Sequence, residues 1–113
     1  MQQSFYNQLW RAAWAVFFVV ELFSGASAQD SPSVQRGRAF AVANCARCHS
    51  VDKVTQSPLP LAPPFRILHL RYPVESLEEA LAEGISVGHI MPEFRLDPGQ
   101  IGDFLDFLKS LEP

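Results

Sequence analysis

The stretch that decides the fold is Cys45-Ala46-Arg47-Cys48-His49. A Cys-x-x-Cys-His run is the attachment signature of c-type haem, and each part of it has a chemical role. Two thiols three residues apart at a helix end lie on one side of the backbone, where they can form thioethers with the two vinyl groups of one porphyrin. The imidazole that follows then points towards the iron as its proximal ligand. The motif therefore predicts one covalently bound haem held by both cysteines.

Other uses of a Cys-x-x-Cys pair fit this chain less well. A structural zinc needs four ligands, and the chain has only two cysteines. His69 and His89 can in principle complete a Cys₂His₂ set, but twenty residues separate them instead of three to five. A thioredoxin-like redox pair would need a βαβ context, which the sequence does not show. A plain disulfide between Cys45 and Cys48 stays open as an alternative.

The N-terminus has the layout of a secretory signal peptide. Arg11 precedes an apolar run over residues 12–20, and the Ala-Ser-Ala of residues 26–28 is an A-x-A cleavage site. The run is too short for a comfortable membrane span, and Glu21 interrupts it. We expect export to remove residues 1–28, with an uncleaved leader as the alternative.

Residues 29–113 are expected to form one small domain. They carry eight basic and eleven acidic side chains, which gives a formal charge of −3. A chain of this length buries a limited core and often needs a staple, which a covalent haem would supply. The acidic balance without a basic tract argues against a nucleic-acid partner. It favours redox partner proteins with basic docking surfaces.

Helical signals dominate the expected domain, and no convincing strand alternation is visible. Ser31 as cap and Pro32 at the first position predict a helix that runs to about Cys48. Gly37 and Ala41 fall four residues apart and so share one face of it. Small residues on one face allow a second helix to approach closely.

The middle of the domain is expected to be loops and short helices. Four prolines mark residues 52–64 as a loop, and residues 65–70 predict one or two helical turns. Ser76 and Glu79 fit a capping box, which predicts a helix that ends just before Gly84. A second loop is expected from there to the last helix.

The last helix has the clearest pattern in the sequence. Asp97 as cap, Pro98 at the first position and Gln100 able to reach back predict where it begins. An apolar stripe follows at helical spacing, made of Ile101, Phe104, Leu105, Leu108 and Leu111. The sequence therefore predicts an all-α domain of three to four short helices packed around one haem.

Met91 is the strongest candidate for the sixth iron ligand, because it is the only methionine in residues 29–113. It lies in a glycine-containing loop, and Pro92 after it favours an extended backbone. Met/His ligation raises the haem potential and closes the position where small ligands would bind, which suits electron transfer. His89, His69 or an open sixth position remain as alternatives.

In combination, these motifs make the sequence resemble small class I bacterial cytochromes c. The motifs are CARCH after a first helix, an APPF segment, GHIMPEF, and IGDFLDFLKSL in the terminal helix. The resemblance covers essentially all of residues 29–113. It implies the class I cytochrome c fold around one covalently attached haem c with its iron.

The resemblance also assigns the site residues. Cys45 and Cys48 would be the thioether residues, His49 the proximal ligand and Met91 the distal ligand. Pro63 matches the proline whose carbonyl oxygen accepts a hydrogen bond from Nδ1 of the proximal histidine. That hydrogen bond would fix the tautomer of His49 and strengthen it as a ligand.

The sequence departs from the family pattern at several positions. Ala62 stands where glycine often precedes that proline, and Ala41 stands where many relatives have an aromatic residue four positions before the first cysteine. Phe104 and Phe107 are large, so we expect the bulky residue of the helix crossing to come from the last helix. Residues 29–113 lack tryptophan, so propionate partners of longer relatives cannot be transferred. Candidates by chemistry alone are Arg66, Arg71 and Tyr72.

The implied function is one-electron transfer between redox proteins in the bacterial periplasm, and not catalysis. No set of residues suggests a nucleophile, a general base or a substrate pocket. Two alternatives remain at this point. One is a dedicated cytochrome subunit of a periplasmic dehydrogenase, and the other is a haem-based ligand sensor or peroxidase-like protein with a weak sixth ligand.

Overall fold

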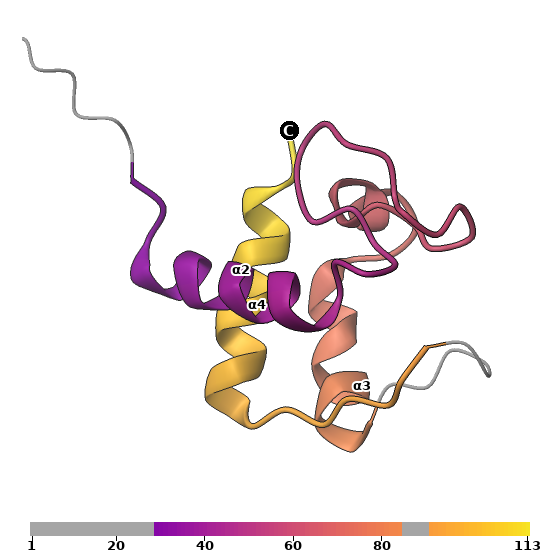
Figure 1. The fold of residues 1–113 in the computed structure, drawn as a ribbon. Helices are drawn as coiled ribbons and strands as arrows, with labels where there is room; N and C mark the ends of the chain where they lie inside the picture. The colour runs from indigo at the N-terminus through magenta and orange to yellow at the C-terminus, as the bar shows by residue number, and fades with distance from the viewer. Residues whose placement is uncertain (1–28, 85–90) are drawn as a thin grey trace, which may run out of the picture.

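The computed structural model describes residues 29–84 and 91–113. Over these residues the chain forms three α-helices, α2 (Pro32–Asn44), α3 (Leu77–Glu83) and α4 (Pro98–Ser110) (Figure 1). Two short 3₁₀ helices, η2 (Phe65–Leu70) and η3 (Val74–Ser76), lie between α2 and α3 in the chain. The described residues contain no β-strand, so the all-α prediction is confirmed.

Helix α2 begins where the sequence predicts. The hydroxyl of Ser31 accepts a hydrogen bond from the backbone N–H of Val34 at 3.3 Å, and Pro32 occupies the first position. The hydrogen bond satisfies a backbone donor that has no partner within the helix, and the ring of Pro32 fixes the φ angle of the first helical residue.

Helix α2 ends earlier than the predicted end near Cys48. Its last helical residue is Asn44, and the backbone N–H groups of Cys45 and Ala46 both donate to the carbonyl oxygen of Ala41. Two donors on one carbonyl break the regular i→i−4 ladder, so the chain leaves the helix axis at this point. The attachment motif therefore lies in the turn after the helix rather than in its last turn.

Helices α2 and α4 cross in direct contact, and Figure 1 shows α2 passing in front of α4. A Cβ atom added to Gly37 would overlap the carbonyl oxygen of Asp103 and lie 2.8 Å from Cβ of Phe107. Ala41, on the same face of α2, has no exposed surface. The predicted close approach is confirmed, and the bulky side chains at the crossing come from α4, as expected.

Helix α3 ends as predicted but begins differently. Gly84 follows its last residue with a φ angle of +110°, a conformation that favours glycine. The capping box predicted at Ser76 is wrong, because the Ser76 side chain makes no cap hydrogen bond. Ser76 is the last residue of η3 and already has helical backbone angles, so the chain enters α3 without the extended residue that a cap needs.

Helix α4 supplies most of the core. Its predicted capping box is confirmed: Asp97 Oδ1 accepts from the Gln100 N–H at 2.9 Å, and Gln100 Oε1 accepts from the Asp97 N–H at 3.2 Å. All five residues of the predicted stripe are buried, and Phe107 is buried with them. The core that they form also includes Ala41, Phe65, Leu68, Val74, Leu81 and Leu96.

Part of the sequence prediction lies outside the described residues. The predicted signal peptide, residues 1–28, is one such part, and His89 is another. Within the described ranges, no helix is both long and apolar enough to span a lipid bilayer.

Candidate haem-attachment site

The attachment motif forms a tight turn at the end of α2. The backbone N–H groups of Cys48 and His49 both donate to the carbonyl oxygen of Cys45, at 3.1 and 2.9 Å. Both cysteines are half-buried free thiols. Burial raises the pKa of the Cys45 thiol to about 11, and the neighbouring Cys48 adds to the shift. Before a haem is attached, the Cys45 sulfur is therefore a protonated thiol at pH 7.

The imidazole of His49 is held in one orientation by a backbone hydrogen bond. Its Nδ1 atom lies 2.8 Å from the carbonyl oxygen of Pro63. A carbonyl oxygen only accepts, so Nδ1 is the donor, and in the neutral imidazole Nε2 then keeps its lone pair. The hydrogen bond expected from the family resemblance is thus present in the structure. The ring of Phe65 packs against the imidazole, with the ring centroids 4.8 Å apart.

Two backbone hydrogen bonds hold the proline segment beside the attachment turn. The N–H of Phe65 donates to the carbonyl of Ser50 at 3.0 Å, and the N–H of Leu59 donates to the carbonyl of Cys48 at 3.1 Å. Ala62 is buried, and its N–H closes a local turn by donating to Leu59 at 3.0 Å. None of the described non-glycine residues has a positive φ angle, so this turn does not require the glycine that relatives often have.

A polar network lies immediately behind His49. Arg66 Nη1 donates to the carbonyl oxygen of Thr55 at 2.6 Å and to the hydroxyl of Ser50 at 3.3 Å. The Ser50 and Thr55 hydroxyls are 3.1 Å apart, and Ser50 is only 3% exposed. Sequence reasoning made Arg66 a candidate propionate partner and missed this role. The only available signal was a serine directly after the motif histidine.

Asp52 closes the loop that this network holds. Its carboxylate accepts hydrogen bonds from the backbone N–H groups of Val54 and Thr55, both at 2.7 Å, and from the Thr55 hydroxyl. The Thr55 hydroxyl bond, followed by the two backbone bonds, lowers the pKa of Asp52 to about 2. The loop is therefore organised around an ionised carboxylate.

Met91 lies on a separate segment that returns from α3 towards α4. Its side chain is half-buried. Beyond it, the ring of Phe94 meets the ring of Phe40 on α2 edge to face, with centroids 6.2 Å apart at 80°. The N–H of Leu96 donates to the carbonyl of Leu81 in α3 at 3.0 Å. The structure thus brings Cys45, Cys48, His49 and Pro63 together in one unit and presents Met91 from another.

A chain of aromatic rings connects the two units through the core. It runs from His49 to Phe65, then to Phe104 on α4, Phe40 on α2 and finally Phe94. The successive centroid distances are 4.8, 5.8, 5.6 and 6.2 Å. Three of the four contacts are edge to face, which is a favoured aromatic geometry.

The residues of this site fit a haem c. Two free thiols flank one turn, and the adjacent imidazole keeps its Nε2 lone pair for iron. His69 Nδ1 on η2 is buried and has no hydrogen-bond partner in the described part of the chain. Among the same residues, no three His, Cys, Asp or Glu side chains gather as a metal site.

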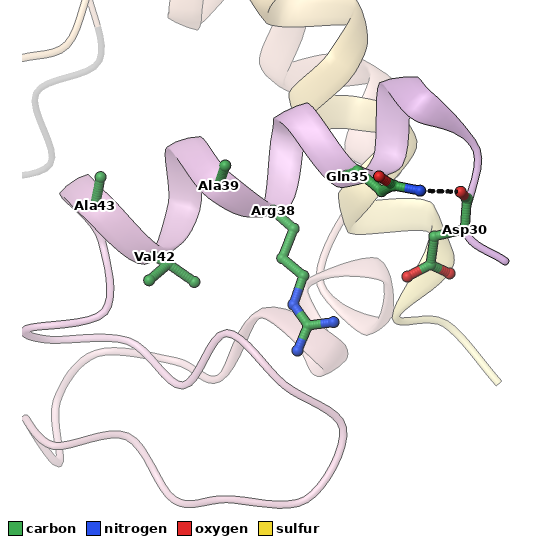
Figure 2. Close-up of a pocket in the computed structure, with 6 residues that line it drawn as sticks. All are labelled: Asp30, Gln35, Arg38, Ala39, Val42 and Ala43. Atoms are coloured by element: carbon green, nitrogen blue, oxygen red, sulfur yellow. Dashed lines mark hydrogen bonds between the residues drawn. The ribbon is translucent and has the colours of Figure 1, made fainter.

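A shallow depression lies on the outer face of α2, with α4 behind the helix in Figure 2. The Gln35 side chain donates to the carbonyl oxygen of Asp30 at its rim, at 2.7 Å. The depression is lined by Asp30, Gln35, Arg38, Ala39, Val42 and Ala43. It contains none of the residues of the attachment site.

Comparison with known families decides the identity of this arrangement. The family model described as Cytochrome c matches residues 34–112. The chain belongs to the cytochrome c family. As a member, this cytochrome c binds haem c covalently, with its iron, and Cys45 and Cys48 fit the attachment motif. It is an electron-transfer haem protein, in which the bound haem supplies a one-electron iron couple. Searches of curated proteins and of solved structures find no significant match.

Proposed function

We propose that this cytochrome c is a one-electron carrier of the bacterial periplasm, with His49 and Met91 as axial ligands. The observation that carries the proposal is the 2.8 Å contact between His49 Nδ1 and the Pro63 carbonyl oxygen. It fixes the tautomer that leaves Nε2 for iron, and it makes the imidazole a stronger donor. A ligand held in this way changes little between redox states, which suits a carrier.

Met91 is proposed as the distal ligand because of its segment. Pro92 directly after it restricts the backbone, and Phe94 anchors the segment against α2. A thioether held there would favour ferrous iron and raise the potential. It would also close the position that a gas sensor or a peroxidase-like protein keeps open.

Export and docking follow from charge and sequence. Residues 1–28 have the layout of a cleaved leader, which supports a periplasmic site of action. Nine of the eleven acidic residues beyond the leader fall in residues 73–113, and Glu78, Glu79 and Glu83 of α3 are exposed. An acidic surface of this kind would attract redox partners with basic docking surfaces.

The protein should be tested after export from a host that attaches c-type haem. We expect a mass equal to residues 29–113 plus one haem, haem that survives acid-acetone extraction, and the weak red absorption band of a methionine–ferric iron bond. Met91→Ala should abolish that band and let the reduced protein bind carbon monoxide quickly. His69→Ala is the matched control and should leave both unchanged.

Two results would contradict the proposal. Unmodified cysteines in the purified protein would remove covalent haem. If His69→Ala or His89→Ala opens the iron while Met91→Ala is silent, the protein has two histidine ligands, and the high-potential carrier must be withdrawn. A membrane-bound form that keeps residues 1–28 would contradict the export proposal alone.

A further inference from the structure

The ring of Phe40 has an unusual place among the core side chains. It is half-buried on α2 and contacts two other rings, Phe104 at 5.6 Å and Phe94 at 6.2 Å, both edge to face. Neither contact involves a residue of the attachment motif. Phe104 is a buried core residue of α4, so Phe40 is held against a rigid neighbour on one side and holds Phe94 on the other.

Phe94 is the first apolar side chain after Met91 that packs against the core. Only Pro92 and Glu93 separate the two, and both are exposed. Proline fixes its own φ angle and restricts the residue before it, so only a few backbone torsions between Phe94 and Met91 can absorb a displacement of Phe94. Another tie of this segment among the described residues, the hydrogen bond from Leu96 to Leu81, lies further along the chain.

Phe40 lies on a different face of α2 from the two small residues at the helix crossing. Ala41 has no exposed surface and Gly37 lies against Asp103 and Phe107 of α4. One residue along an α-helix corresponds to a rotation of about 100°, so the side chain of Phe40 points away from that crossing point. Its ring therefore reaches Phe94 in the segment that carries Met91.

We propose that Phe40 is a positioning residue for the distal ligand and acts on Met91 through Phe94. The proposal rests on the proposed ligation by Met91. The ring contacts of Phe40 are with Phe94 and Phe104 and not with Met91, so Phe40 sets where the Met91 segment lies relative to α2. Its removal leaves Phe94 without its ring partner, and the segment can then move so that the sulfur spends part of its time away from the iron.

The test uses the exported protein with haem attached. Phe40→Leu keeps apolar volume but removes the ring edge, so we expect a weaker red band and a lower potential. Carbon monoxide should bind roughly three- to tenfold faster, which is the size expected for loss of one aromatic pair, here Phe40 with Phe94. Phe40→Tyr keeps the ring, so its red band, potential and carbon monoxide binding rate should equal those of the unsubstituted protein. Phe94→Leu should reproduce Phe40→Leu, and the double variant should add little.

Phe107→Leu is the matched control. It also truncates a phenylalanine between α2 and α4. Phe107, however, is not one of the rings that link His49 to Phe94. We expect it to lower thermal stability without changing carbon monoxide binding. If Phe107→Leu accelerates binding as much as Phe40→Leu does, the effect is general loosening and the proposal is wrong.

The remaining outcomes separate this inference from the proposed function. If Met91→Ala opens the iron but Phe40→Leu and Phe94→Leu leave band, potential and binding rate unchanged, the positioning role fails and the electron carrier stands. If Met91→Ala itself is silent, the proposed ligation fails and the inference falls with it. Additive effects in the double variant would also overturn the route through Phe94.

Discussion

The two sides of the haem site are held by different kinds of contact. On the proximal side, hydrogen bonds fix His49, its proline partner and the loop behind them, and the buried Ser50 lies at their centre. On the side of Met91, the described contacts that hold the segment are the ring contact at Phe94 and the backbone hydrogen bond from Leu96 to Leu81, and Phe94 also takes part in an isolated β-bridge. Hydrogen bonds impose direction, whereas apolar contacts impose only proximity.

This difference matches what each proposed ligand requires. An imidazole must present one nitrogen in one direction, so its tautomer and ring plane both have to be set. A thioether on a flexible side chain can adapt to small shifts of its backbone. We therefore expect substitutions near His49 to change how strongly the imidazole donates to the iron. Substitutions near Met91 should change how much of the time its sulfur is bound to the iron.

The largest effect should come from removing the covalent haem attachment, on which both sides of the site depend. Replacing Cys45 and Cys48 together by alanine removes both thioether bonds and, with them, the covalent staple of a small core. We expect no stable haem and a poorly folded chain. Haem staining of denatured protein and circular dichroism check this. Retained haem after denaturation would contradict it.

The next largest effect should be on the potential, from exchanging Met91, the proposed distal ligand. Met91→His supplies an imidazole in place of the thioether, which should keep six-coordination but lower the potential markedly, because imidazole favours ferric iron more than a thioether does. Potentiometric titration measures this. A potential unchanged by the exchange would show that Met91 is not the ligand.

A smaller effect should follow from weakening the proximal network. Ser50→Ala removes a buried hydroxyl that contacts Arg66 and Thr55, and we expect a loss of about 1–3 kcal/mol in the free energy of unfolding. The potential should rise slightly as the hydrogen bond to His49 loosens, with no change in carbon monoxide binding. Glu93→Gln, on the segment of Met91, breaks an exposed ion pair with Arg95 and should leave the free energy of unfolding, the potential and carbon monoxide binding unchanged.

The smallest effect should appear only in acid. The pKa of Asp52 is lowered to about 2 in the folded protein, so its hydrogen bonds stabilise the fold above pH 4 and this contribution is lost as the pH falls towards 2. Asp52→Asn should remove that part of the acid dependence. Urea midpoints measured between pH 5 and pH 2 compare the two proteins, and parallel curves would contradict the prediction.

The sequence predicted contacts that depend on local spacing and missed those that depend on distant partners. The caps at Ser31 and Asp97, the stripe of α4 and the small-residue face of α2 all follow from residues within one or two turns. The capping box at Ser76 failed because an adjoining 3₁₀ helix already set its backbone.

The candidate site shows the same division. The motif placed Cys45, Cys48 and His49, and the family pattern placed Pro63. The role of Arg66 and the contact between Phe40 and Phe94 join segments 11 to 54 residues apart, and no local pattern indicates them. The ligation by Met91 stays a prediction.

The contact at Gly37 also bears on the order of events during maturation. It joins the first described helix to the last, and the neighbouring pair Arg36 and Asp103 is separated by 67 residues in the chain. Long-range contacts of this kind form late, because closing so large a loop costs entropy before any contact offsets it. The Cys-x-x-Cys-His turn also precedes α4 in the chain, so it is synthesised before the helix that completes the core around it. We expect a window during export in which the thiols remain accessible to the attachment machinery, and the docking of α4 ends that window.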